Sequence, residues 1–180
     1  GWAKDQRLHF ALQASVPFYR CDRFLAGHPV AGSRAADAAV LSFPPGTTQV
    51  VLKVGISPIN AAGARSNIDA EAPGWDFDAA VVSADAAWER ELGVIDFRTS
   101  DPERMRVFYT ALYHTMIAPV LFNDHNGDYR GVDDVVRRGA PFENYSIFSL
   151  WDTYRAAHPL LTLTQPHRVP DFVNSMLAMD

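Results

Sequence analysis

The side chains best suited to chemistry lie together between residues 144 and 159, where the chain reads Asn-Tyr-Ser-Ile-Phe-Ser-Leu-Trp-Asp-Thr-Tyr-Arg-Ala-Ala-His-Pro. Trp151 and Asp152 are adjacent, and Arg155 follows three residues after Asp152, so that the two charged side chains can pair on a helix. An aromatic ring covers the apolar C–H face of a sugar, and a carboxylate fixed by an arginine accepts hydrogen bonds from hydroxyl groups. This combination predicts a carbohydrate-binding surface.

A single helix is expected to position these side chains. Ser146 or Asn144 is suited to cap its first turn, and His158-Pro159 is expected to end it, because the residue before a proline avoids the α conformation. The predicted helix therefore runs over Tyr145–Ala157. Spacings of three, four and seven residues give this helix an apolar stripe formed by Ile147, Leu150, Trp151 and Tyr154. The adjacent faces carry Phe148, Asp152 and Arg155.

The same pattern has a purely structural explanation. A tryptophan on the apolar stripe of a helix usually packs in the core, and an acid and an arginine three residues apart form an ordinary helix pair. On spacing alone, core packing is the favoured interpretation for Trp151, and a plain ion pair is favoured for Asp152 and Arg155.

Composition limits the possible partners. The chain has 180 residues, of which 48% are hydrophobic and 21% charged, a balance typical of folded globular domains. The net charge of −5, with Lys and Arg scattered among acids, argues against a nucleic-acid partner. No apolar run approaches the roughly 20 residues that cross a bilayer, so we expect no membrane span. Cys21 is the only cysteine and cannot form an internal disulfide.

Residues 1–58 are expected to contribute the end of a larger antiparallel sheet or sandwich, because so few strands cannot bury both of their faces. Strand patterns occur at Leu8–Leu12, Ala39–Phe43 and Val50–Ile56. The spacing of the last two predicts neighbouring strands, and residues 27–36 predict a loop. The residues of metal-ligand type in this part are His9, Cys21 and His28. Their irregular spacing argues against a metal site.

Residues 59–98 predict a linker built of ordered helices. The first helix is alanine-rich and covers residues 60–71. Asp76 or Asp78 is suited to cap the second, and Gly93 is suited to end it. The second helix has a narrow apolar stripe, which suits a helix lying on a neighbouring domain.

The helical pattern is strongest from Thr99 onward, after a short strand expected at Val94–Arg98. Asp101 caps the predicted helix, Pro102 occupies its first position and Pro119 stops it. His114 lies near its end and is expected to be a surface or capping histidine. The core face of this helix is formed by Met105, Phe108, Tyr109, Leu112 and Met116.

A long connection follows, and connections of this length are usually functional. Asn126-Gly127 predicts a turn within it. The stretch Asp124–Asp128 has the glycine too early for an EF-hand and lacks its final glutamate, so it predicts a β-turn and not a calcium loop. A further helix begins near Pro170, so residues 99–180 alternate helix and loop like the opening of an all-α array.

Both ends of the chain lack the usual boundary signals. Strand pattern begins almost at once, and Met176–Asp180 continues a helical pattern with no glycine or asparagine to stop it. We therefore expect a fragment of a longer protein.

An ordered set of motifs resembles glycoside hydrolase family 92, the exo-acting α-mannosidases of bacteria. The main motifs are residues 108–114 (Phe-Tyr-Thr-Ala-Leu-Tyr-His), 128–131 (Asp-Tyr-Arg-Gly), 148–161 (Phe-Ser-Leu-Trp-Asp-Thr-Tyr-Arg-Ala-Ala-His-Pro-Leu-Leu) and 172–177 (Phe-Val-Asn-Ser-Met-Leu). Residues 51–57 and 73–77 also resemble that family's domain junction. The resemblance covers most of the chain from about residue 40, and residues 1–40 match less clearly.

The resemblance implies an α+β fold in three parts: the end of an antiparallel β-sandwich over residues 1–58, a helical linker over 59–98, and the first helices of an (α/α)₆ barrel over 99–180. It implies a calcium-dependent, periplasmic or secreted enzyme that removes terminal α-linked mannose, often α-1,2 linked, with inversion. Trp151 and Asp152 would hold the terminal mannose, with Arg155 and Phe148 in support. The family's catalytic acid, catalytic base and calcium ligands would lie outside this sequence.

Two hypotheses follow. An inverting glycosidase needs two carboxylates about 6.5–9.5 Å apart, and Asp152 cannot perform both tasks. The chain is therefore expected to belong to a mannosidase but to be inactive alone, with the rest of its own polypeptide and a mannose-containing glycan as partners. The alternative is a non-catalytic carbohydrate-binding or structural module. A cleft at Trp151 and Asp152 favours the enzyme, whereas burial of Trp151 against helix 101–118 favours the module.

Overall fold

A computed structural model describes residues 7–32, 35–146 and 148–179. Within them, six helices and nine strands form, and every paired strand is antiparallel. The helices are α1 (Ala61–Glu71), α2 (Phe77–Leu92), α3 (Pro102–Thr115), α4 (Leu150–Thr153), α5 (Ala157–Thr164) and α6 (Val169–Leu177). The strands are β1 (His9–Ala14), β2 (Arg20–Leu25), β3 (His28–Val30), β4 (Ala38–Ser42), β5 (Leu52–Ser57), β6 (Val120–Leu121), β7 (Tyr129–Arg130), β8 (Val136–Arg137) and β9 (Tyr145–Ser146).

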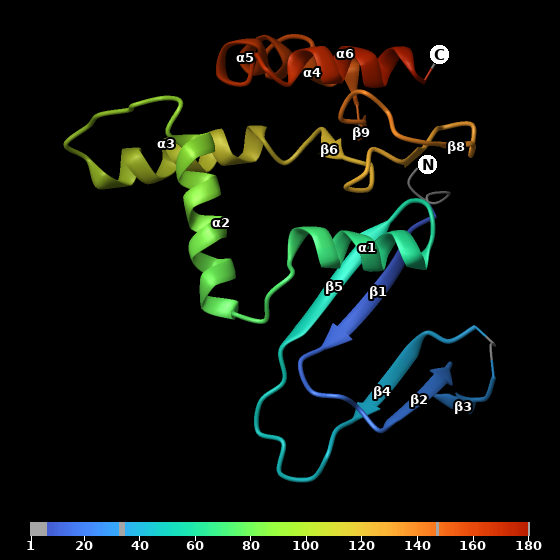
Figure 1. Cartoon of the computed structure of the whole chain (residues 1–180). Coiled ribbons are helices and arrows are strands. Elements are labelled where there is room, and N and C mark those ends of the chain that lie inside the picture. Colours follow the sequence, from blue (N-terminus) through green and yellow to red (C-terminus); the bar gives the residue numbers. More distant parts are fainter. Residues whose placement is uncertain (1–6, 33–34, 147, 180) are drawn as a thin grey trace.

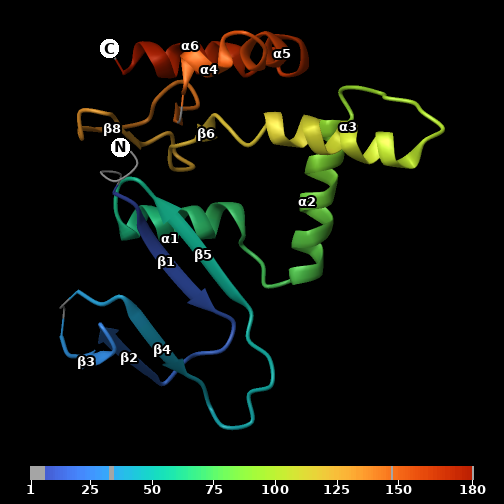
Figure 2. The same ribbon diagram turned by 180° about the vertical axis from the view of Figure 1, so that it is seen from behind.

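The elements are arranged in levels (Figure 1). The three-stranded sheet β3-β2-β4 lies at one end, and the pair β1–β5 with α1 lies next to it. Helix α2 leads from there to the level that holds α3 and the short strands, above which α4, α5 and α6 lie. The reverse view shows the same order (Figure 2). No helix in the described ranges has both the length and the apolar character to cross a bilayer.

Helix α1 packs closely on one face of the β1–β5 pair. Gly55 permits this approach, because a Cβ atom there would lie 2.2 Å from the carbonyl oxygen of Ala64. The opposite face carries exposed apolar side chains that alternate along both strands, including Phe10, Leu12, Val54 and Ile56. The pair is thus buried on one face only.

The pairing predicted between the segments 39–43 and 50–56 is wrong. β4 pairs with β2, and β5 pairs with β1 in a separate sheet. Part of the predicted loop at 27–36 is strand β3, which forms a hairpin with β2 through Ala26 and Gly27, both at positive φ. The sequence of β2, Arg-Cys-Asp-Arg-Phe-Leu, lacks apolar alternation, so its strand was not predicted.

The three expected helix starts are confirmed. The side chains of Asn60, Asp76 and Asp101 each accept hydrogen bonds from backbone N–H groups in the first turn of α1, α2 and α3. Helix α2 ends at Gly93 as predicted. His114 is exposed in the last turn of α3, as expected of a surface histidine.

The strand predicted at Val94–Arg98 does not form. The segment instead packs along α3, where the hydroxyl of Tyr109 donates to the carbonyl of Ile95 at 3.0 Å and accepts from the N–H of Phe97 at 3.3 Å. The rings of Phe97 and Phe108 stack with centroids 4.3 Å apart. Side-chain contacts with a helix thus replace the pairing with another strand.

The helix predicted over Tyr145–Ala157 is also wrong. Tyr145 and Ser146 form β9, which pairs with β6, and α4 is a single turn that begins at Leu150. Pro159 lies in the first turn of α5, where an N–H group has no partner within the helix, so His158-Pro159 begins a helix and does not end one. Residues 162–164, which lie between the two helices predicted from the sequence, also belong to α5. Ile147 lies outside the described residues.

A small core holds the C-terminal elements together. It consists of Tyr145, Leu161 and Phe172, with Phe148 and Met176 packed against it. The rings of Tyr145 and Phe172 meet edge to face at 4.7 Å. The apolar face of α6 is only half covered, because Phe172 is buried whereas Leu177 is 69% exposed.

Candidate functional site

The segment Phe148–Arg155 contains all four side chains predicted to bind or support a sugar. Trp151 is 81% exposed and Asp152 is exposed beside it, so Trp151 neither packs in the core nor lies buried against α3. Neither residue lines the pocket described below. The structure therefore contradicts core packing for Trp151, and it presents both side chains on an open surface.

Local hydrogen bonds orient Asp152. The hydroxyl of Ser149 donates to its carboxylate, and the hydroxyl of Thr153 donates to the carbonyl of Ser149 at 2.9 Å. One carboxylate oxygen takes the Ser149 bond, and the exposed group retains capacity to accept from a ligand. Asp152 is thus positioned but still open to solvent.

The predicted pair between Asp152 and Arg155 does not form in the described part of the chain. Helix α4 ends at Thr153, and Arg155 lies in the following turn, where three-residue helical spacing no longer applies. Its Nε instead donates to the hydroxyl of Tyr154 at 3.0 Å, with the guanidinium 5.6 Å from the ring centroid. Arg155 therefore orients Tyr154, a second exposed aromatic side chain next to the motif.

Phe148 is the anchor of the segment. Its ring stacks on His158 with centroids 6.3 Å apart and meets Phe172 edge to face at the same separation. It thus attaches the start of the segment to the core, while Trp151 projects into solvent.

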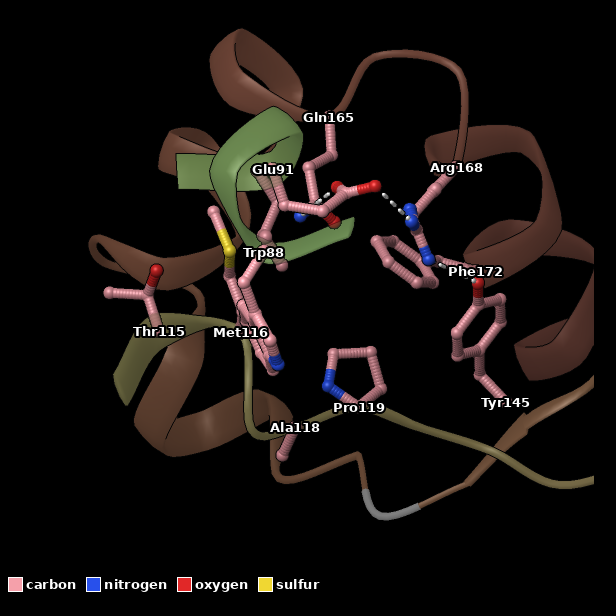
Figure 3. Close-up of a pocket in the computed structure, with 11 residues that line it drawn as sticks. Trp88, Glu91, Thr115, Met116, Ala118, Pro119, Tyr145, Gln165, Arg168 and Phe172 are labelled. Atoms are coloured by element: carbon pink, nitrogen blue, oxygen red, sulfur yellow. Dashed lines mark hydrogen bonds and ion pairs between the residues drawn. The ribbon is translucent and has the colours of Figure 1, made fainter. Parts of the chain in front are cut away.

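A second arrangement of an aromatic, an acid and an arginine lines a partly open pocket of about 110 Å³ (Figure 3). The Glu91 carboxylate accepts from Arg168 Nη2 at 3.0 Å and from Gln165 Nε2 at 3.4 Å. Arg168 Nη1 donates to the hydroxyl of Tyr145 at 3.4 Å, and Trp88 lines the same pocket. These residues come from α2, β9 and the α5–α6 connection, so no local spacing in the sequence could predict them.

Arg168 is held in its charged form by its neighbours, which raise the pKa of its guanidinium. Burial is the largest single influence and lowers the pKa of its guanidinium, but the hydrogen bond and charge of Tyr145 and the carboxylate of Glu91 together raise that pKa above its ordinary value. Both side chains of the ion pair are only partly exposed. Solvent therefore screens this pair less than the surface pairs.

Asp124 is buried where the connection after α3 meets α1 and β5. Its carboxylate accepts from Ser57 Oγ at 2.8 Å and from Asn67 Nδ2 at 2.9 Å, and the residue is 3% exposed. The N–H of His125 donates to Asn67 Oδ1 at 3.0 Å. We call Ser57, Asn67 and Asp124 the Asp124 junction.

The connection that contains Asp124 forms the predicted turn. The N–H of Gly127 donates to the carbonyl of Asp124 at 2.9 Å, with Gly127 at φ +81°. Burial is the largest influence on Asp128 and raises its pKa, but Arg138, the N–H of Gly139 and Asn126 donate to it and hold the pKa below its usual range. Protein donors thus bind both carboxylates, as expected of a β-turn and not of a calcium loop.

Metal ligands are not gathered in the described ranges. No group of three or more His, Cys, Asp or Glu side chains there is placed to hold an ion. His9, Cys21 and His28 lie on three different strands. The calcium site stays a prediction, whose ligands the family resemblance places outside this sequence.

Comparison with known proteins identifies the chain. The profile of the glycosyl hydrolase family 92 catalytic domain matches residues 63–180. The structure of the family GH92 α-mannosidase BT3965 from Bacteroides thetaiotaomicron superposes with a TM-score of 0.84 at 33% identity, covering 96% of this chain and 25% of that chain. The same enzyme in complex with mannoimidazole gives the same score and identity, covering 96% and 24%.

A curated relative agrees with this result. An uncharacterized secreted glycosidase of Arthroderma benhamiae is 33% identical over an alignment of 114 residues, and the match covers 61% of this chain and 14% of that protein. The matches place the chain among the glycoside hydrolases. Because the family profile covers more than half of the chain, the protein belongs to glycosyl hydrolase family 92. It spans about a quarter of the length of the solved structures that it matches.

Proposed function

We propose that this chain is part of a longer glycoside hydrolase that removes terminal α-linked mannose from glycans. The observation that carries the proposal is the family match over residues 63–180, which includes the exposed Trp151 and Asp152. The similarity to an α-mannosidase that has been seen with mannoimidazole supports mannose as the sugar. The preferred linkage in this proposal is α-1,2, as the motifs imply.

Trp151 and Asp152 would hold the terminal mannose. The indole ring would cover the apolar face of the sugar, and the carboxylate, oriented by Ser149, would accept hydrogen bonds from its hydroxyl groups. Binding of this kind fixes the orientation of the glycosidic bond relative to groups that act on it. Asp152 is thus a binding residue in this proposal and not the general acid or base.

The reaction class that the motifs imply is hydrolysis with inversion. One carboxylic acid protonates the leaving oxygen, and a carboxylate on the opposite face activates water, with the two groups about 6.5–9.5 Å apart. We assign both to parts of the parent polypeptide outside residues 1–180, together with the ligands of the proposed calcium ion. The 180-residue chain alone is then inactive, and release of mannose by it would contradict this assignment.

The family also suggests the architecture and location of the parent protein. The exposed apolar face of β1–β5 would be covered by the rest of an antiparallel β-sandwich, and α3 to α6 would begin an (α/α)₆ barrel. The similarity to a secreted glycosidase supports a secreted or periplasmic location. Bacterial origin is part of the same proposal.

A non-catalytic carbohydrate-binding or structural module is the second candidate. It is kept because the described residues form no cleft at Trp151 and Asp152, which would have favoured the enzyme; the two side chains lie on an open surface outside the pocket of Figure 3. Burial of Trp151 against α3, which would have favoured the module, is not seen either. The two candidates differ in turnover, because a binding module retains its sugar without cleaving it.

The test is release of mannose from α-1,2-mannobiose by the full-length gene product, with and without a calcium chelator. We expect calcium-dependent release that collapses in Asp152→Ala. Activity that survives this substitution would reduce Asp152 to a structural role. Absence of activity on any α-mannoside, with retained binding, would favour the module.

A further inference from the structure

Arg168 joins the helical linker to the C-terminal elements by an ion pair with Glu91 (Figure 3). It precedes α6 directly and donates from one guanidinium nitrogen to Glu91 near the end of α2 and from another to the hydroxyl of Tyr145 in β9. The fork of the guanidinium thus reaches two elements at once, which a single ammonium cannot reproduce.

Tyr145 leads directly to the motif. Its backbone N–H donates to Ser175 Oγ at 2.8 Å, and its ring packs on Phe172. Phe148, three residues later, packs on the same Phe172 ring. Tyr145 and Phe148 are therefore both held by α6, and Arg168 donates to the hydroxyl of Tyr145.

The motif has little support of its own. Helix α4 is one turn long, and the Ser149 and Thr153 bonds that order it lie within the segment itself. Trp151 and Tyr154 are exposed and contribute nothing to packing that would fix the turn. The orientation of α4 thus depends on what anchors its start.

We propose that Arg168 is a positioning residue for the sugar-binding segment. Arg168 is held by Glu91 and fixes Tyr145, whose ring shares the Phe172 contact with Phe148 at the start of the segment. It thereby determines where Trp151 and Asp152 meet the sugar; the substrate part of this inference rests on the proposed function. Arg168 acts through Tyr145 and does not touch the sugar. Glu91 brings the linker helix into the same chain of contacts, so movement of α2 would be transmitted to the motif.

The test compares Arg168→Gln and Tyr145→Phe with Arg98→Gln in the full-length enzyme. Arg98 is a matched control, because it makes two bonds to Asp96 on an exposed loop. Tyr145→Phe removes only the hydroxyl and leaves the packed ring in place. Affinity for mannoimidazole is measured by calorimetry, and kcat and KM are measured with α-1,2-mannobiose.

We expect Arg168→Gln to weaken mannoimidazole binding roughly tenfold, as for the loss of one charge-assisted hydrogen bond, and Tyr145→Phe to weaken it by a smaller factor. The combined variant should be no weaker than Arg168→Gln alone, because both changes break the same link. Arg98→Gln should change nothing. Equal affinity in Arg168→Gln and wild type, or a fully additive double variant, would overturn the proposal.

Hydrogen exchange separates this inference from the proposed function. Backbone amides of residues 148–155 should exchange roughly tenfold faster in Arg168→Gln than in wild type, with no change in Arg98→Gln. Equal exchange overturns the positioning role whatever the activity. A wild-type enzyme that neither binds mannoimidazole nor cleaves α-mannosides contradicts the proposed function and the substrate part of this inference, while the exchange result still decides whether Arg168 orders the segment.

Discussion

The motif segment, residues 148–155, and the Asp124 junction each place a carboxylate in the C-terminal half of the chain. The two carboxylates differ in their burial and in their hydrogen-bond partners. Asp124 is 3% exposed and accepts bonds from Ser57 and Asn67, which lie more than 50 residues earlier in the sequence. Asp152 is exposed, and its hydrogen bond comes from Ser149, three residues away.

The difference distinguishes a carboxylate that stabilises the fold, Asp124, from one proposed to bind the substrate, Asp152. A buried carboxylate whose oxygens are occupied by protein donors stabilises the fold and has little capacity for a ligand. The backbone also leaves room for Asp124, because a side chain at Gly63 would collide with it: a Cβ atom there would lie 2.5 Å from Asp124 Oδ2. An exposed carboxylate that is oriented locally adds little to stability but is ready to accept bonds from a sugar. We therefore expect substitutions at the two sites to affect different measurements.

Asp152→Ala should produce the largest effect on activity. Two hydrogen bonds from sugar hydroxyls to a charged carboxylate are worth about 2 kcal/mol each, so kcat/KM of the parent enzyme should fall roughly 1,000-fold. The melting temperature should stay within the error of measurement, because the side chain is exposed and makes one local bond. Steady-state kinetics on an α-mannoside together with thermal unfolding check both statements.

Asp152→Asn is the matched control. It keeps the shape and one acceptor oxygen but removes the charge, so its loss of activity should be intermediate. A variant Asp152→Ala that unfolds early would show that this carboxylate supports the fold, and the contrast with Asp124 would fail.

Asp124→Ala should instead reduce stability. It leaves Ser57 and Asn67 with unsatisfied buried donors, and we expect the free energy of unfolding to fall by about 3 kcal/mol. KM for mannosides should change little in the folded fraction. Chemical denaturation of the parent enzyme measures the loss, and Asp69→Ala, which removes an exposed bond from Gln13, is the control.

How much could be predicted from the sequence follows the same division between local and distant contacts. The starts of α2 and α3 were predicted from their caps, because a cap is a contact between residues two or three apart, and the start of α1 from its alanine-rich pattern. The helix expected at 145–157 was wrong because Tyr145 pairs with Leu121 and bonds to Ser175, partners that local spacing cannot reveal. Likewise, β4 pairs with β2, whose polar sequence gave no strand signal.

The candidate site shows the same limit. Trp151 and Asp152 were singled out from their types and from family motifs, and their exposure agrees with a binding role without testing it. The expected partner of Asp152, Arg155, bonds elsewhere because α4 is too short to hold both on one face. Glu91 and Arg168 could not have been paired in advance, since 77 residues separate them.

Trp151→Ala should weaken sugar binding by a smaller factor than the loss of Asp152. Covering roughly 60 Å² of apolar surface is worth about 1.5 kcal/mol, so affinity for mannoimidazole should fall roughly tenfold. Stability should be unchanged, because the side chain is 81% exposed. Trp151→Phe should recover part of the affinity. If both variants bind as wild type does, the ring lies outside the sugar site and the motif segment binds through Asp152 alone.

Substitution of Asp133 should have the smallest effect, and that effect is on stability. Its carboxylate is exposed, and its partners, like that of Asp152, lie within four residues in the sequence. Two bonds from Arg137, at 2.8 and 3.0 Å, and one from the N–H of Val135 lower the pKa of Asp133 to about 2. Because the folded pKa is lower than the unfolded value of roughly 4, the contribution of this pair to stability is present above pH 4 and is lost as the pH falls toward 2.

The difference in the urea midpoint of unfolding between wild type and Asp133→Asn should therefore be small at pH 6 and disappear between pH 4 and pH 2. High salt should reduce it at pH 6, since the pair is exposed. A difference that stays the same from pH 6 to pH 2 would mean that the effect of Asp133 on stability does not depend on the charge of its carboxylate.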